Sequence, residues 1–214
     1  LGVQFFTRNE AGRAVRPEIT VNLAAVNQRL MLLARQQSED MKSQLVKAGV
    51  RIVTGDGRLE GPDRLVVSTG KGKKRTDFDE IQADTLVVAV GASPRVLPTA
   101  KPDGKRILTW TQLYSLDEVP EHLIVVGSGV TGAEFASAYR ALGAQVTLVS
   151  SRDQVLPGED ADAARVIENV FIRGGMKVLS KSRMQSVERS GDGVVVTLSD
   201  GRTVEGSHCL LAVG

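Results

Sequence analysis

The 214-residue sequence has few residues from which disulfides or metal centres are built. It contains one cysteine, Cys209, and two histidines, His122 and His208, that lie far apart in the chain. A single cysteine excludes an internal disulfide and a Cys-x-x-Cys redox pair, and the apolar run HCLLAV around Cys209 favours a buried, inert thiol. Neither histidine has an acidic residue or cysteine at ligand spacing, so we expect no metal site.

Aromatic residues, excess charge and long apolar runs are also scarce. Aromatics make up 4% of the chain, and 27 basic residues nearly balance 25 acidic ones. The chain therefore has no large net charge of the kind that would indicate nucleic acid as a partner. The basic run at 71–75 is typical of a solvated hairpin tip. No apolar run approaches the roughly 20 residues of a membrane span, and no signal peptide pattern is present, so we expect a cytoplasmic protein without membrane partners.

The most informative feature is the segment VVGSGVTGAEF at 125–135, which places G-x-G-x-x-G between two structural patterns. An apolar run at 123–126 precedes it and is typical of a buried parallel strand. A helical pattern follows, with apolar residues at 135, 138, 139 and 142 and a stop at Gly143. In this context the glycines form a dinucleotide-binding fingerprint, although a glycine-rich turn without a ligand is the alternative.

Each residue of the fingerprint has an expected role. Gly127 permits the tight turn, Gly129 leaves space for a pyrophosphate, and Gly132 lets helix and strand pack closely. The start of the helix presents free N–H groups and a partial positive charge to phosphate. The expected contacts in this segment are Gly127, Ser128, Gly129, Val130, Thr131 and Gly132.

The end of the second strand, predicted at 145–149, bears on the choice between NAD and NADP. An acidic residue there would bind the ribose 2′-hydroxyl of NAD, but the chain has Ser150, Ser151 and Arg152. Without a carboxylate to repel a 2′-phosphate, and with a guanidinium to pair with it, NADP is admissible. Two alternatives stay open: Asp153 would restore NAD binding if the loop curls back, and Arg152 would be a solvated loop charge.

The remaining patterns predict two parts of the chain. A long helix is expected at 20–48, followed by short strands at 50–55, 63–70, 78–81 and 85–90 that form an antiparallel meander. From residue 122 the pattern alternates strand, helix, strand, helix (161–173) and strand (176–180), and a second meander follows whose hairpin is Asp200-Gly201. This alternation predicts an α/β, Rossmann-like, three-layer dinucleotide-binding domain, with strands 122–126, 145–149 and 176–180 parallel.

Four segments together resemble the flavin-dependent pyridine nucleotide:disulfide oxidoreductases, the family of dihydrolipoamide dehydrogenase and glutathione reductase. They are GDGRL at 55–59, LVVAVGASPR at 86–95, IVVGSGVTGAEF at 124–135 and LLAVG at 210–214, in the family's order and spacing. The run ILTWTQLYSLDEVPEHLIVVGSGVTGAEF is most similar to the NAD(P)H quinone reductase branch. The resemblance implies FAD and NAD(P) as cofactors.

The resemblance also implies a division of the chain and a role for further residues. Residues 1–115 are then the C-terminal part of an FAD-binding domain, and 116–214 an NAD(P)-binding domain. Gly57 would face the FAD adenosine, Met184 would lie beside the adenine of NAD(P), and Gly214 near its nicotinamide half. Glu134 would point at the nicotinamide as the catalytic residue, although a glutamate in a first helical turn is also a favourable dipole partner. The segment Val90, Gly91 and Ala92 would run along the flavin nucleotide, with Val90 where the family commonly has Thr.

The sequence starts at Leu1 rather than Met and ends directly after a strand pattern, which favours a fragment. By resemblance, the parent is a homodimer whose dimerisation domain, FAD phosphate loop and redox cysteine segment are absent here, so we expect the isolated chain to be inactive. The expected function of the parent is hydride transfer from NAD(P)H to FAD and on to a quinone or disulfide. Alternatives are dihydrolipoamide dehydrogenase proper and a non-catalytic NAD(P)-sensing module. A non-flavin dehydrogenase is disfavoured because no catalytic His or Tyr-Lys constellation follows the fingerprint.

Overall fold

Five parallel strands form the central sheet of the computed structural model, which describes residues 7–8, 14–15, 20–70, 74 and 76–213. The described residues divide into a smaller unit, within 31–93, and a larger unit, within 1–30 and 94–214. The central sheet belongs to the larger unit and has the strand order β6-β13-β7-β8-β9. Its strands are β6 (Ile107–Thr109), β7 (His122–Val126), β8 (Gln145–Val149), β9 (Lys177–Leu179) and β13 (His208–Leu211).

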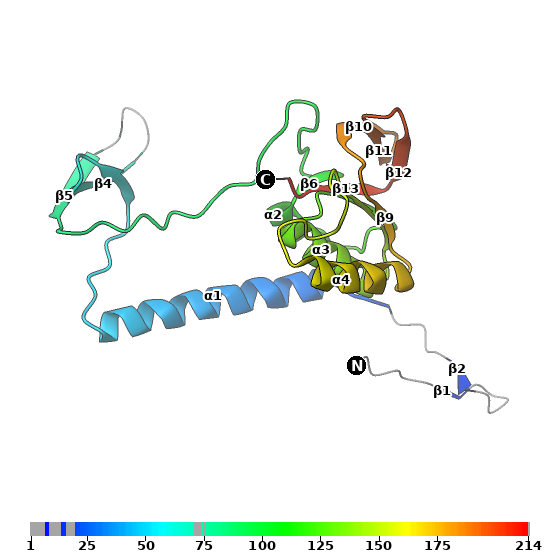
Figure 1. Ribbon diagram of the computed structural model, residues 1–214. Coiled ribbons are helices and arrows are strands. Elements are labelled where there is room, and N and C mark those ends of the chain that lie inside the picture. Colours follow the sequence, from blue (N-terminus) through cyan, green and yellow to red (C-terminus); the bar gives the residue numbers. More distant parts are fainter. Residues whose placement is uncertain (1–6, 9–13, 16–19, 71–73, 75, 214) are drawn as a thin grey trace. The chain divides into compact units, whose positions relative to one another are not determined.

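Helices cover one face of this sheet and an antiparallel meander covers the other (Figure 1). The helices that lie wholly within this unit are α2 (Trp110–Leu113), α3 (Val130–Ala141) and α4 (Ala161–Arg173). The meander consists of β10 (Met184–Ser190), β11 (Gly193–Leu198) and β12 (Thr203–Gly206). The predicted α/β three-layer class and the parallel pairing of β7, β8 and β9 are confirmed.

The two-residue period of the strands divides the core into two layers. On β7, Leu123 and Val125 pack in the layer shared with α3, whereas Ile124 and Val126 pack in the layer shared with the meander. All four side chains are buried. The continuous apolar run at 123–126 is therefore explained by a strand that is covered on both faces.

The buried face of α3 includes the predicted Tyr139 but otherwise differs from the predicted one. Ala133, Ala136 and Tyr139 are buried, whereas Ala138 is exposed and Phe135 is only partly buried. Close packing of the helix against the sheet admits small side chains, so the two alanines face the strands. The larger Phe135 packs at the edge of this core layer and contacts Tyr114 edge to face, with ring centroids 6.0 Å apart.

The predicted long helix is present as α1 (Leu23–Lys47), but little of it is buried. Only Leu23 and Asn27 of this helix are buried, and the Asn27 side-chain amide donates to the Leu116 carbonyl oxygen at 2.9 Å. The predicted apolar stripe that includes Leu30, Leu33, Met41 and Leu45 is exposed. None of the helices formed by the described residues is long and apolar enough to cross a membrane.

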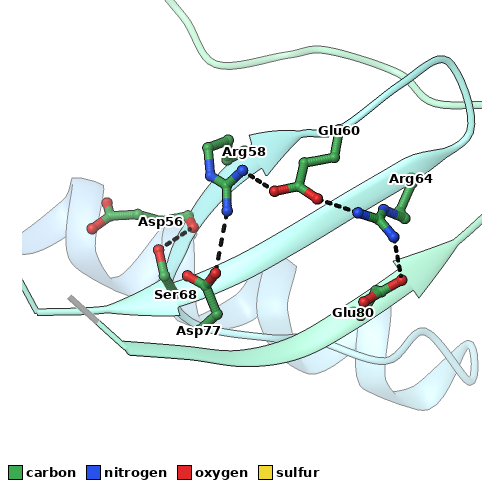
Figure 2. Close-up of polar contacts among 7 residues, drawn as sticks. All are labelled: Asp56, Arg58, Glu60, Arg64, Ser68, Asp77 and Glu80. Carbon is green, nitrogen blue, oxygen red and sulfur yellow. Dashed lines mark hydrogen bonds and ion pairs between the residues drawn. The ribbon is translucent and has the colours of Figure 1, made fainter.

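The smaller unit contains the predicted antiparallel meander, made of β3 (Asp56–Leu59), β4 (Arg64–Thr69) and β5 (Thr76–Gln82). Glu60 lies between Arg58 and Arg64 and forms ion pairs with both (Figure 2). The hydrogen bond from Arg64 and, to a smaller extent, that from Arg58 lower the pKa of Glu60. The same arginines reach β5: Arg58 contacts Asp77 at 3.2 Å and Arg64 contacts Glu80 at 3.1 Å. In the larger unit, a short antiparallel pair joins β1 (Thr7–Arg8) and β2 (Ala14–Val15).

Two strands predicted in the smaller unit are wrong. The pattern at 50–55 does not pair, because the turn after β3, closed by the Glu60 N–H to the Arg64 carbonyl at 2.9 Å, sets residues 56–59 opposite β4. The apolar segment at 85–90 is extended but joins no sheet, and Val87 and Val90 are 86% and 88% exposed. A strand needs a neighbouring backbone with which to pair, and among the described residues no strand pairs with this segment.

A polar cluster fixes the loop that leads into β6. One oxygen of Asp103 accepts the backbone N–H groups of Lys105, Ile107 and Arg106 at 2.8–2.9 Å, and the other accepts from Arg189 at 3.0 Å. Burial acts in the opposite sense, but these donors lower the pKa of Asp103. Next to it, His208 is buried with its Nε2 3.0 Å from the Arg106 guanidinium. Burial and the positive charges of Arg106 and Arg189 lower the pKa of His208 to about 4.

We expect His208 to make the fold sensitive to acid. A histidine in the unfolded chain has a pKa of about 6.5, whereas that of folded His208 is about 4, so the folded state binds a proton less readily. The contribution of His208 to the free energy of unfolding is therefore complete above pH 6.5. It is lost as the pH falls from about 6.5 towards 4, by at most about 3 kcal/mol in the free energy of unfolding. His208→Gln should reduce this loss by about 1–3 kcal/mol, measured by urea unfolding at pH 7.5 and 4.5. An unchanged loss in the variant would mean that other groups carry the acid sensitivity.

Candidate functional site

Two glycines of the fingerprint are required by the protein's own backbone. Gly127 has a φ of +111°, and a Cβ there would lie 2.3 Å from the Ala212 carbonyl oxygen. A Cβ on Gly132 would lie 1.8 Å from the Gly127 carbonyl oxygen. Both distances are well below van der Waals contact, so neither position admits a side chain. The turn after β7 is thereby held against the end of β13 and the first turn of α3.

Gly129 is different, because nothing in the described structure requires a glycine there. Its φ of −67° and ψ of −177° suit any residue, and no heavy atom lies within 4 Å of the position that a Cβ would take. The open space above Gly129 faces solvent at the start of α3. A Cβ would therefore occupy space that the protein itself leaves empty.

The turn forms one wall of a cavity of about 380 Å³ at the carboxyl ends of the parallel strands. Crevices at this edge, where neighbouring strands connect in opposite directions, are where open α/β sheets bind ligands. The cavity is lined by Val126, Gly127, Ser128 and Gly129 after β7, Val149, Ser151, Arg152 and Pro157 after β8, Ser182, Arg183 and Met184 before or in β10, Ala212 and Val213 after β13, and Arg95 and Leu97.

The amino end of α3 supplies backbone donors beside this cavity. Gly129 is its N-cap residue and offers no side chain to the first turn. Among the described residues, the backbone N–H groups of Val130, Thr131 and Gly132 have no protein acceptor. A helix start with free N–H groups and the positive end of the helix dipole attracts an anion, phosphate above all.

Ser150 lies beneath the cavity and does not line it. Its side chain is fully buried, and its hydroxyl is 2.7 Å from that of Ser128 and accepts the backbone N–H of Arg152 at 3.1 Å. The Ser128 carbonyl oxygen also accepts the N–H of Leu156 at 2.8 Å. These contacts tie the fingerprint turn to the loop after β8 and hold both in one arrangement.

The loop after β8 presents a cation to the cavity. Ser151 and Arg152 line it, whereas Asp153 does not. Arg152 is exposed, and among the described residues its guanidinium has no hydrogen-bond or ion-pair partner. Arg183 and Arg95 line the same cavity, although no sequence pattern marked either of them as a contact. Arg183 directly precedes Met184, the predicted adenine contact, and this neighbouring position is the one sequence signal that could have identified it.

Glu134 and Val130 line a different hollow from the predicted nucleotide contacts that line the cavity, which are Gly127, Ser128, Gly129, Ser151, Arg152 and Met184. Glu134 is exposed on α3 and lines an apolar hollow of about 690 Å³ between α3 and α4, together with residues such as Val130, Leu156 and Ile167. Helix α3 connects the two sites. Its N-cap residue Gly129 lines the cavity, whereas Glu134 lies in its second turn and not in the first turn that the sequence predicted.

The residues predicted to contact flavin all belong to the smaller unit. Gly57 lies in β3 opposite Val67, and a Cβ there would sit 3.3 Å from the Leu65 side chain. Val90, Gly91 and Ala92 lie in the exposed, extended segment, where Gly91 has a φ of +71°. The predicted contact Gly214 lies outside the described residues.

Comparisons with known proteins agree with this architecture. The sequence profile described as pyridine nucleotide-disulphide oxidoreductase matches residues 8–214. The chain is 50% identical over 198 residues to an NAD(P)H dehydrogenase (quinone) of Mycobacterium tuberculosis, covering 91% of this chain and 40% of that protein. It is 32% identical over 186 residues to a dihydrolipoyl dehydrogenase of Zymomonas mobilis, covering 85% of this chain and 39% of the relative.

A solved structure is also similar. The crystal structure of LpdA from Mycobacterium tuberculosis matches with a TM-score of 0.81 and 49% identity, over 92% of this chain and 43% of that one. The chain thus spans about two fifths of the length of the curated relatives it matches. With its parallel sheet, its fingerprint turn and these similarities, the chain belongs to the pyridine nucleotide-disulphide oxidoreductase family.

Proposed function

We propose that this chain is part of a flavin-dependent NAD(P)H oxidoreductase that passes hydride from NAD(P)H to FAD and on to a quinone. In this proposal residues 116–214 form the NAD(P)-binding domain, and residues 1–115 belong to the FAD-binding domain. The observation that carries the proposal is the empty space above Gly129, beside the free N–H groups of α3. The fold itself does not require a glycine at this position, whereas a bound pyrophosphate would need the space that a side chain would fill.

The residues around the cavity fit an extended dinucleotide. Gly127, Gly129 and the first turn of α3 would hold the pyrophosphate, and Ser128 would support the turn through its hydroxyl contact with Ser150. Arg152 and Ser151, at the end of the second strand, would lie at the adenosine ribose, where this fold recognises the 2′ position. Met184 would supply an apolar contact to the adenine.

The flavin contacts are proposed from the family. Gly57 and the segment Val90, Gly91 and Ala92 would contact FAD, and the strong exposure of Val90 is consistent with a surface that a further part of the protein or a cofactor covers. Bound together, the two cofactors supply the hydride chemistry, while the protein orients them. Glu134 would act on the nicotinamide side, from its exposed position on α3.

The electron acceptor is proposed to be a quinone because the relative at 50% identity has that name, whereas the dihydrolipoyl dehydrogenases reach 32–33%. A disulfide acceptor is the second candidate. An NAD(P)-sensing module without turnover is the third, and flavin content separates it from both.

We expect the full-length protein to contain bound flavin and to reduce a quinone with NAD(P)H. The measurements are its visible absorbance spectrum and steady-state oxidation of NADPH with a quinone or with lipoamide as acceptor. If the protein holds flavin and reduces lipoamide but not a quinone, it belongs to the disulfide-reducing branch instead. A protein that binds NAD(P)H but holds no flavin would favour the sensing module.

We expect Gly129→Ala to weaken nicotinamide nucleotide binding without unfolding the domain, because a methyl group would occupy the pyrophosphate space. The loss should be at least tenfold in Kd, about 1.4 kcal/mol, by calorimetry. Gly158→Ala is the matched control, since a Cβ there also has no neighbour within 4 Å, and it should bind normally. Gly132→Ala should instead lower the thermal midpoint. Unchanged binding by a folded Gly129→Ala protein would remove the assignment.

We expect the full-length protein to accept NADPH at least as well as NADH, with Arg152 as the reason. A partly exposed pair between the guanidinium and a 2′-phosphate should contribute about 1–3 kcal/mol, a preference of about five- to hundredfold that weakens at high salt. Steady-state kinetics of wild type and Arg152→Ala with both cofactors measure this. A tenfold preference of the wild type for NADH, or the same cofactor ratio in the variant, would identify Arg152 as a solvated loop charge.

A further inference from the structure

Arg183 faces the same cavity as Arg152 but comes from a different loop. It is exposed and lies between β9 and β10, directly before Met184. Among the described residues, its guanidinium has no hydrogen-bond or ion-pair partner. Two arginines whose guanidinium groups have no partner among the described residues thus line one cavity of about 380 Å³, and no described residue neutralises their positive charge.

Backbone hydrogen bonds fix the two loops side by side. Because β9 is the neighbour of β8, the segments that follow these strands leave the sheet together. The Lys181 N–H donates to the Arg152 carbonyl oxygen at 2.7 Å, and the Ser182 N–H donates to that of Ser150, also at 2.7 Å. Arg183 therefore starts next to the strand end at which this fold recognises the adenosine ribose.

The loop before β10 is also held from its other side. The Arg183 carbonyl oxygen accepts the N–H of Ser199 at 2.8 Å, and Arg202 donates to the Ser182 hydroxyl at 2.8 Å. The backbone that carries Arg183 is thus anchored to the β11–β12 turn as well as to the loop after β8. A cation on such a fixed backbone loses less conformational freedom when it binds an anion.

Backbone strain points to the same place. In the part of the chain that the structure describes, the two non-glycine residues with left-handed φ are Leu156 (+54°) and Lys181 (+53°). Both donate their N–H to a loop at the cavity: Leu156 to Ser128 and Lys181 to Arg152. Strain of this kind persists where the surrounding structure fixes it, and it concentrates at ligand sites.

We propose that Arg183 is a second cofactor-selecting residue, which together with Arg152 binds the adenosine 2′-phosphate of NADPH from the two neighbouring loops. This inference rests on the proposed nucleotide site. Its chemistry is recognition of a phosphate dianion by two guanidinium groups, each able to donate two hydrogen bonds. The uncharged 2′-hydroxyl of NADH would gain little from either.

Adenosine 2′,5′-bisphosphate and adenosine 5′-monophosphate separate the 2′-phosphate from all other contacts, and neither requires turnover. Calorimetry on the chain should show that Arg183→Ala weakens the bisphosphate about five- to thirtyfold and the monophosphate less than twofold. The double variant Arg152→Ala/Arg183→Ala should bind the two probes equally. Arg165→Ala, an exposed arginine of α4 outside the cavity, removes the same charge and should leave the ratio unchanged.

Three outcomes would contradict the inference. Equal weakening of both probes by Arg183→Ala would mean that the guanidinium contacts the adenine or the 5′-phosphate. An unchanged probe ratio in a folded Arg183→Ala protein, confirmed by circular dichroism, would exclude Arg183 while leaving the proposed nucleotide site intact. No measurable binding of either probe by wild type would overturn the proposed nucleotide site and this inference together.

Discussion

The contact between the turn after β7 and the end of β13 is the constraint on which the larger unit depends. Gly127 and Gly132 have no side chains because the Ala212 and Gly127 carbonyl oxygens occupy that space. The Ala212 N–H donates to Val126, and the Gly127 N–H donates to Val149, so the ends of three parallel strands are joined by backbone hydrogen bonds. Substituting either glycine would separate these strand ends, and the cavity that they form would be lost.

Around this contact, polar groups divide into those that the fold uses and those that it leaves available. The hydroxyl groups of Ser128 and Ser150 bond to each other in the interior, and the Asp103 carboxylate is saturated by backbone donors and Arg189. In contrast, the guanidinium groups of Arg152 and Arg183 have no partner among the described residues. Buried polar groups must be satisfied within the protein, so groups left unpaired at a cavity are the ones that can serve a ligand.

The same distinction applies to glycines and to strands. The fingerprint gave Gly127 and Gly132 backbone roles and Gly129 the pyrophosphate space by position alone. The structure supplies the physical reason, because a Cβ would meet a carbonyl oxygen at Gly127 and at Gly132 but no heavy atom within 4 Å at Gly129. Likewise, the valines at 87, 88 and 90 have the composition of a buried strand, yet they are exposed because no described strand adjoins them. Apolar side chains favour a strand, but a neighbouring backbone is needed to form one.

The sequence by itself determined the α/β class, the helices α1, α3 and α4, the parallel direction of β7, β8 and β9 and the position of the fingerprint turn, because periodicity and glycine spacing are local signals. Only the tertiary structure decided that Ser150 is buried beneath the cavity, that Arg152 and not Asp153 lines it, and that Arg183 joins it from another loop. Arg152 and Arg183 are 31 positions apart, and only the pairing of β8 with β9 brings their loops together. Such convergence depends on strand order, which local patterns do not encode.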